Sequence, residues 1–89
     1  MYHIKFLNCA PGEKQQFLES MKQFSSDTEG IEVIGLFYPR GSNYDYAAVT
    51  KYKDYATWEK YWAETAEQRQ SGLHIITQQT DMFFEEIEL

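Results

Sequence analysis

The chain has 89 residues, of which 43% are apolar and 17% are aromatic. This length fits a single small domain, residues 1–89, and the composition is too apolar for a disordered segment. Acidic side chains outnumber basic ones by 14 to 8, and the resulting net charge of −6 disfavours nucleic acids and anionic membranes as partners.

The first part of the chain predicts a strand, a helix and a second strand. Residues 2–9 alternate as a strand should, and Pro11-Gly12 then opens a helix over residues 13–26 with an apolar stripe. Gly30 is a plausible helix-to-strand turn. Residues 31–38 are apolar and β-branched enough for a second strand, in which Gly35 indicates a bulge or a close approach.

The second part predicts a strand, a helix and a final strand. A turn at residues 39–43 and a strand over 44–52 complete a β-hairpin. Asp54 is a good N-cap for a second helix, which Gly72 ends or bends. This helix has a broad aromatic stripe, which consists of Tyr55, Trp58, Tyr61, Trp62 and Thr65. Residues 73–81 are expected to add another helical turn or two, and residues 82–89 to form the last strand.

The order βαββαβ predicts an α+β fold of the ferredoxin-like type. Right-handed crossovers would place both helices on one face of a four-stranded antiparallel sheet, with the first strand central. The other face should be polar if it meets water. In the two strands of the hairpin, residues 31–38 and 44–52, either set of alternating side chains is largely apolar. We therefore expect a second copy to cover this face in a homodimer that closes a barrel.

Several segments make the chain resemble the dimeric α+β barrel superfamily, most of all its antibiotic-biosynthesis-monooxygenase-like and NIPSNAP-like members. The segments are Pro11-Gly12 followed by Glu13 and Phe17, Glu29-Gly30, and the runs at 44–49, 52–55 and 58–62. The resemblance implies the fold and the dimer. Members of this superfamily include oxygenases, polyketide cyclases, haem-handling proteins, isomerases and proteins with no known reaction.

Two histidines are the candidate catalytic residues. His74 follows the second helix, in a segment that in superfamily relatives often lies at the mouth of the cavity, and there it could act as a general base. The alternative is a partly exposed polar residue. His3 shares one side of the first strand with Lys5, and the two could converge on an anionic or enolic ligand. Alternatively, Lys5 pairs with an acid within residues 85–88 of the last strand and His3 has no function.

Four aromatic side chains are the candidate substrate contacts: Tyr38, Tyr46, Tyr61 and Trp62. They could line a pocket for a planar substrate, although such stripes are more often core. Cys9 is expected to be a small buried side chain. The single cysteine excludes an intrachain disulfide, and the histidines and carboxylates show no metal-ligand spacing. No apolar stretch reaches the length of a signal-peptide core or a membrane span, so we expect a cytoplasmic protein.

These observations lead to one functional hypothesis and its alternatives. The first is a small cofactor-independent enzyme, monooxygenase-like, that acts on an aromatic or polyketide-like metabolite. In this hypothesis a histidine removes a substrate proton, and the resulting anion reacts with oxygen or, in the cyclase version, closes a ring. The alternatives are a non-catalytic dimeric module that binds a small ligand or partner, and a haem-handling protein with His3 or His74 as axial ligand.

Overall fold

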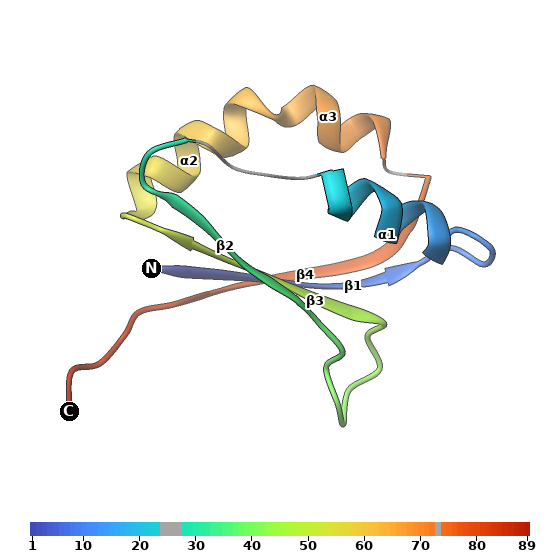
Figure 1. Cartoon of the computed structure of the whole chain (residues 1–89), viewed down its shortest axis with the longest axis horizontal. Helices are drawn as coiled ribbons and strands as arrows, with labels where there is room; N and C mark the ends of the chain where they lie inside the picture. Colours follow the sequence, from blue (N-terminus) through green and yellow to red (C-terminus); the bar gives the residue numbers. More distant parts are fainter. Residues whose placement is uncertain (24–27, 73) are drawn as a thin grey trace.

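The computed structural model describes residues 1–23, 28–72 and 74–89. Four strands form an antiparallel sheet in the order β2-β3-β1-β4, and the described helices lie on one face of it (Figure 1). This arrangement confirms the predicted ferredoxin-like α+β fold. The elements are β1 (Tyr2–Cys9), α1 (Lys14–Gln23), β2 (Ile31–Phe37), β3 (Tyr46–Tyr52), α2 (Tyr55–Glu64), α3 (Ala66–Ser71) and β4 (Ile76–Phe84). Among the described helices, none is long and apolar enough to cross a membrane.

Local sequence signals explain the first half of the fold. β1 has the predicted bounds, and Gly12 makes the turn into α1 with a φ of 80°. Gly30, with a φ of 85°, precedes β2 and accepts a hydrogen bond from Lys53 N through its carbonyl. The register of β2 against β3 shifts between Val33 and Gly35, which confirms the predicted bulge.

The second half of the fold differs from expectation in its helix and its last strand, and β3 begins at Tyr46 and not at residue 44. The helical segment breaks at Thr65 into α2 and α3, and Gly72 is the C-cap of α3. The expected helical turns at 73–81 and last strand at 82–89 are wrong, because β4 runs from Ile76 to Phe84. Its polar residues do not suggest a strand, but β4 is an edge strand whose backbone pairs with β1 along its length. Leu73 lies outside the described residues.

The corrected position of β4 changes the partner of Lys5. In the β1–β4 register Lys5 lies opposite Asp81, whereas residues 85–88 follow the end of the strand. The suggested pairing of Lys5 with an acid of residues 85–88 is therefore wrong. Figure 1 shows that these last residues extend beyond the sheet as a tail.

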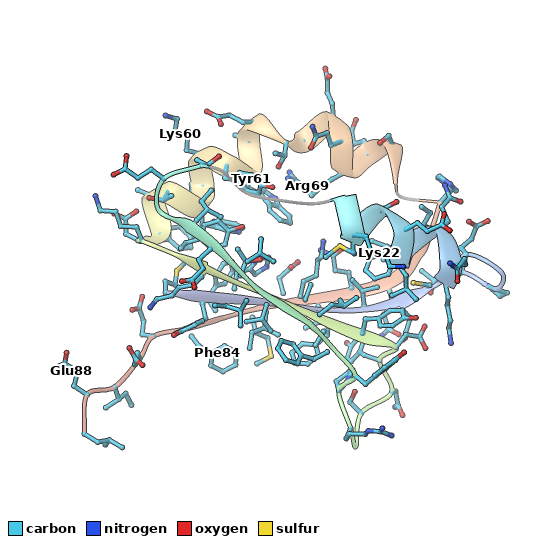
Figure 2. All side chains as sticks on the ribbon, in the orientation of Figure 1. Lys22, Lys60, Tyr61, Arg69, Phe84 and Glu88 are labelled. Carbon is cyan, nitrogen blue, oxygen red and sulfur yellow. The ribbon has the colours of Figure 1, made fainter. Side chains whose placement is uncertain are left out.

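The two faces of the sheet differ in what covers them. On the helix side, Leu7 is fully buried and packs in a core with Cys9, Phe17, Tyr46 and Ile75. This burial confirms the prediction for Cys9. The alternate side chains point away from the helices. We call this side of the sheet the open face, and Figure 2 shows Phe84 on it. Along the cross-strand register, the apolar side chains of the open face are Tyr2, Ile4, Phe6, Phe37, Ala47, Val49, Met82 and Phe84, and the polar residues Glu32, Lys51 and Thr80 share this face.

Candidate pocket between the helices and the sheet

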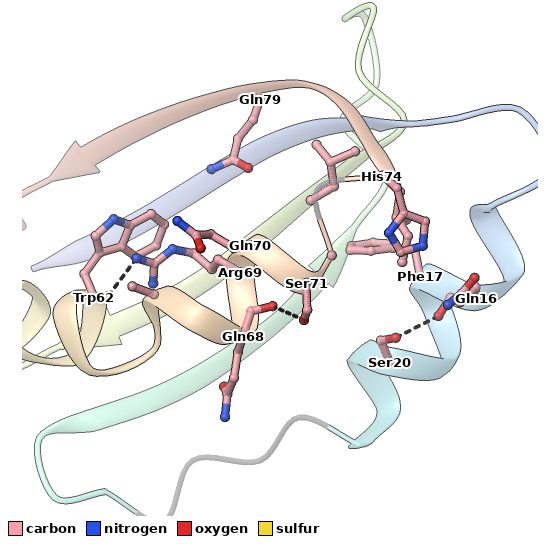
Figure 3. A pocket seen from close by; sticks show the side chains of 14 residues that line it. Gln16, Phe17, Ser20, Trp62, Gln68, Arg69, Gln70, Ser71, His74 and Gln79 are labelled. Atoms are coloured by element: carbon pink, nitrogen blue, oxygen red, sulfur yellow. Dashed lines mark hydrogen bonds between the residues drawn. The ribbon is translucent and has the colours of Figure 1, made fainter.

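A pocket of about 610 Å³ lies between α1, α3 and the segment that leads into β4. Its walls combine apolar side chains, such as Phe17 and Trp62, with neutral polar ones, among them four glutamines and two serines. Figure 3 shows Trp62 and Arg69 at one end of the pocket and His74 and Phe17 at the other. The pocket therefore combines an apolar surface with hydrogen-bonding groups at both ends.

Arg69 is held in a fixed position at one end of this pocket. Its guanidinium lies 3.6 Å from the centre of the Trp62 ring, so the cation rests on an aromatic face. One terminal nitrogen donates to Thr65 Oγ1 at 2.7 Å, and the other donates to the Trp62 carbonyl at 2.7 Å. Thr65, where α2 ends, therefore also fixes the Arg69 guanidinium through a hydrogen bond between residues four apart.

His74 belongs to the wall at the other end of the pocket. Its side chain is exposed and makes no hydrogen bond to another described residue. The next residue, Ile75, is buried in the core, and the Ile75 carbonyl accepts a hydrogen bond from Ala10 N. The buried neighbour fixes the backbone at His74, while the imidazole stays accessible to a ligand in the pocket.

His3 is buried under α2 and is not part of the pocket wall. Only 4% of its surface is exposed, and its Nε2 lies 2.8 Å from Oδ1 of Asp81. The ring stacks on Phe83 at 4.9 Å and meets Trp62 edge-on at 5.7 Å between ring centroids. The nearby Trp58 indole nitrogen is buried without a hydrogen-bond partner in the described chain. His3 therefore lies in an aromatic enclosure, with Asp81 as its polar contact.

Gln79 connects this buried pair to the pocket. The Gln79 side chain lines the pocket and donates from Nε2 to Oδ2 of Asp81 at 3.0 Å. Burial would raise the pKa of Asp81, but the hydrogen bonds from His3 and Gln79, together with the electrostatic attraction of His3 and Lys5, lower the pKa below its usual value. Asp81 is thus held as a carboxylate between the buried imidazole and the pocket wall.

Lys5 places a second cation in the layer between the sheet and the helices. Burial lowers the pKa of its ammonium below the usual value; Asp81 opposes this shift and Arg69 adds to it. Burial also raises the pKa of Tyr52 to about 12, and the phenol of Tyr61 shifts upward for the same reason. Both phenols stay protonated at neutral pH and remain hydrogen-bond donors.

The predicted substrate contacts occupy different places. Trp62 lines the pocket, and Tyr61 lies in the same layer as Arg69 (Figure 2). Tyr46 is in the core, where its ring packs on Phe17 at 5.2 Å. Tyr38 is 70% exposed next to the hairpin turn and does not line this pocket. The pocket thus brings together His74 and Trp62 of the predicted set; whether any of these residues contacts a substrate stays a prediction.

Sequence reasoning missed Arg69, Gln79 and Asp81. The spacing of Arg69 from Trp62, seven residues or two helical turns, would have placed both on one helix face. The sequence predicts a helical turn at Asp81, and only the register of β4 brings it opposite Lys5. No sequence signal identifies Gln79, because its place in the pocket wall depends on this segment forming the strand β4.

No protein-family model and no curated protein matches the chain. Two solved structures share its fold at low sequence identity. The crystal structure of PA3566 from Pseudomonas aeruginosa superposes with a TM-score of 0.78 and 11% identity, over 98% of this chain and 93% of that one. The transcriptional regulator NMB0573 from Neisseria meningitidis, crystallised with L-methionine, gives a TM-score of 0.64 and 13% identity. The second match covers 99% of this chain but 52% of the regulator, so this chain spans about half of that protein.

Proposed function

We propose that this chain is a homodimeric module that binds a small organic molecule in the pocket between α1, α3 and β4. The pocket itself carries the proposal, because 610 Å³ falls within the range of roughly 300–1,000 Å³ typical of small-molecule sites. Its apolar surface would bury the ligand, and its amides, hydroxyls and cation would orient it. A neighbour in fold, the meningococcal regulator, was crystallised with the small ligand L-methionine, which is compatible with this use of the fold.

A pair of adjacent substitutions on α1 tests the site. Ser20 lines the pocket, whereas the neighbouring Glu19 does not, and both side chains are exposed. Small organic fragments, screened by backbone amide NMR, should shift resonances of α3 and residues 74–79 in the wild-type chain. Ser20→Phe should abolish these shifts by filling the pocket, and Glu19→Phe should retain them. Fragment shifts that survive Ser20→Phe, or no fragment binding at all, would rule out this pocket as the binding site.

His74 favours a catalytic version of the same proposal. In this version the chain is a cofactor-independent enzyme, monooxygenase-like, that acts on an aromatic or polyketide-like metabolite. His74 removes a proton from the bound substrate, and the carbanion or enolate adds O2 to form a peroxide. The protonated His74 returns the proton, and loss of water from the peroxide leaves one oxygen atom on the substrate, so the substrate supplies all the electrons. In the cyclase version, that anion attacks a carbonyl of the same molecule instead. The accessible ring of His74 in the pocket wall supports the role of base, since a general base must reach the proton it removes.

Turnover and binding separate the catalytic version from the binding module. With hydroxylated anthrones and linear polyketide analogues, oxygen uptake and mass spectrometry of products would distinguish oxygen insertion from ring closure. His74→Ala should reduce turnover by orders of magnitude and leave ligand affinity nearly unchanged. Full turnover in His74→Ala would exclude His74 as the base. A wild-type chain that binds these compounds without turnover would exclude the catalytic version and favour the binding module.

The open face supports the homodimer. Phe37, Met82 and Phe84 are 49%, 43% and 43% exposed, and they belong to the same face as the apolar side chains of β1 and β3. Apolar side chains recur on this face along all four strands, and a monomer would leave the exposed ones in water. A second copy offers an identical apolar face, so two sheets packed face to face would bury both.

A further inference from the structure

We infer that the ligand of this pocket is a small organic anion, a carboxylate attached to an apolar group, and that Arg69 recognises its charge. This inference rests on the proposed function, because it assigns a ligand class to the same pocket. Arg69 thereby becomes a specificity-determining residue.

The charge of the pocket contrasts with the charge of the chain. The whole sequence has a net charge of −6, with 14 acidic side chains against 8 basic ones. The described walls of the pocket nevertheless contain no Asp or Glu, and their charged side chain is Arg69, with the titratable His74 at the other end. A cation in pocket walls that lack carboxylates gives a local positive potential, even in an acidic chain. Such a potential favours an anionic ligand.

No carboxylate of the described chain forms an ion pair with Arg69. The described ion pairs join His3 to Asp81 and Lys14 to Asp45, so neither involves this guanidinium. The carboxylate of Asp81, on the helix side of the sheet, already has His3 and Gln79 as hydrogen-bond partners and interacts with the charge of Lys5. A ligand carboxylate would supply the counter-charge that the protein leaves out.

The position of Arg69 is also suited to a carboxylate. Its two described hydrogen bonds, to Thr65 Oγ1 and the Trp62 carbonyl, use part of the guanidinium and leave further N–H groups for a ligand. The stack on Trp62 holds the plane of the guanidinium before any ligand arrives, so little side-chain entropy remains to be lost on binding. Away from Arg69, Phe17 and Ile75 provide the apolar wall for the rest of the ligand.

Matched pairs of carboxylates and neutral amides test the inference. Benzoate with benzamide, and 3-phenylpropionate with 3-phenylpropionamide, have nearly the same shape and differ in charge. Titrations at pH 7.5, followed by amide NMR, should give at least about tenfold tighter binding of each carboxylate to the wild-type chain. Added NaCl should weaken the carboxylates and leave the amides nearly unchanged. Inorganic phosphate, which has no apolar part, should bind more weakly than benzoate.

Variants of Arg69 then assign the preference to this side chain. Arg69→Gln should remove the difference within each pair, Arg69→Lys should keep part of it, and Arg40→Gln in the hairpin turn should keep all of it. Equal binding of acids and amides by the wild-type chain would overturn the anion inference and leave the pocket proposal standing. Absence of binding by all four organic probes would overturn both. Phosphate binding as tight as that of benzoate would overturn the assignment of an apolar group to the ligand. If Arg69→Gln does not fold, the salt dependence of carboxylate binding to the wild-type chain tests whether the pocket recognises the negative charge.

Discussion

His3 and Asp81 face each other diagonally across the β1–β4 pairing, with the imidazole Nε2 2.8 Å from the carboxylate Oδ1. The residue directly opposite Asp81 is Lys5, and Gln79 on the same strand donates to the same carboxylate. One carboxylate is therefore hydrogen-bonded to a buried imidazole and to an amide of the pocket wall, and it interacts with the charge of Lys5. Such a shared group should control both the stability of this layer and its response to pH.

Removal of the Asp81 carboxylate should destabilise the fold. In Asp81→Ala the buried His3 ring loses its hydrogen-bond partner, and an unsatisfied buried polar group costs roughly 1–3 kcal/mol of the free energy of unfolding. Urea unfolding at pH 7, followed by circular dichroism, measures the loss. The control Glu86→Ala, in the exposed tail, should change stability by less than about 0.5 kcal/mol. Equal losses in the two variants would show that His3 does not need this partner.

Acid should weaken the protein partly through Asp81. The pKa of this carboxyl in the folded state lies below its ordinary value of 3.8, so the unfolded chain binds the proton first as the pH falls. The stabilisation from Asp81 is thus complete above about pH 4 and is lost as the pH falls through the lower folded-state pKa. Asp81→Asn should be less stable at pH 7 and should lose less stability on acidification than the wild type. Parallel curves of unfolding free energy against pH would contradict this assignment.

Lys5 should report the balance of charges between the sheet and the helices. Its pKa lies below 10.5 because of burial, with Asp81 raising it and Arg69 lowering it further. Asp81→Asn should therefore lower the midpoint of Lys5 ionisation, and Arg69→Gln should raise it, when the lysine Cε resonance is followed by NMR against pH. The distant variant Arg40→Gln should leave the midpoint unchanged. Shifts of the same sign in the two charge variants would mean that changes in burial dominate.

The elements that the sequence predicts well are those with local causes. β1 alternates strictly and ends before Pro11-Gly12, so its bounds follow from its own residues. Asp54 confirms its predicted role because its side chain accepts a hydrogen bond from Thr57 N at 2.8 Å, an interaction within one helical turn. The bulge near Gly35 likewise reflects a residue that lacks a side chain.

The elements that the sequence misses depend on distant partners. β4 contains polar residues that lack a clear alternation, and it is a strand because β1 supplies its backbone partners. The candidate site depends on that pairing, because it places Asp81 and Gln79 in this layer. Arg69 depends in addition on the break at Thr65, which no glycine or proline announces. His74 could be placed near a cavity through the family resemblance. The spacing from Trp62 could place Arg69 on the same helix face, but not its contacts with Thr65 and the Trp62 ring.

The open face yields the last prediction, that the chain is a dimer in solution. Sedimentation equilibrium at micromolar concentration should give twice the monomer mass of 10.5 kDa. Met82→Asp places a charge on the open face, where Met82 lies beside Ile4 in the β1–β4 register, and should shift the particle toward the monomer. Ala56→Asp adds the same charge on the exposed side of α2 and should leave the dimer intact. A folded wild-type monomer at these concentrations would contradict the dimer and would mean that water or another partner covers this face.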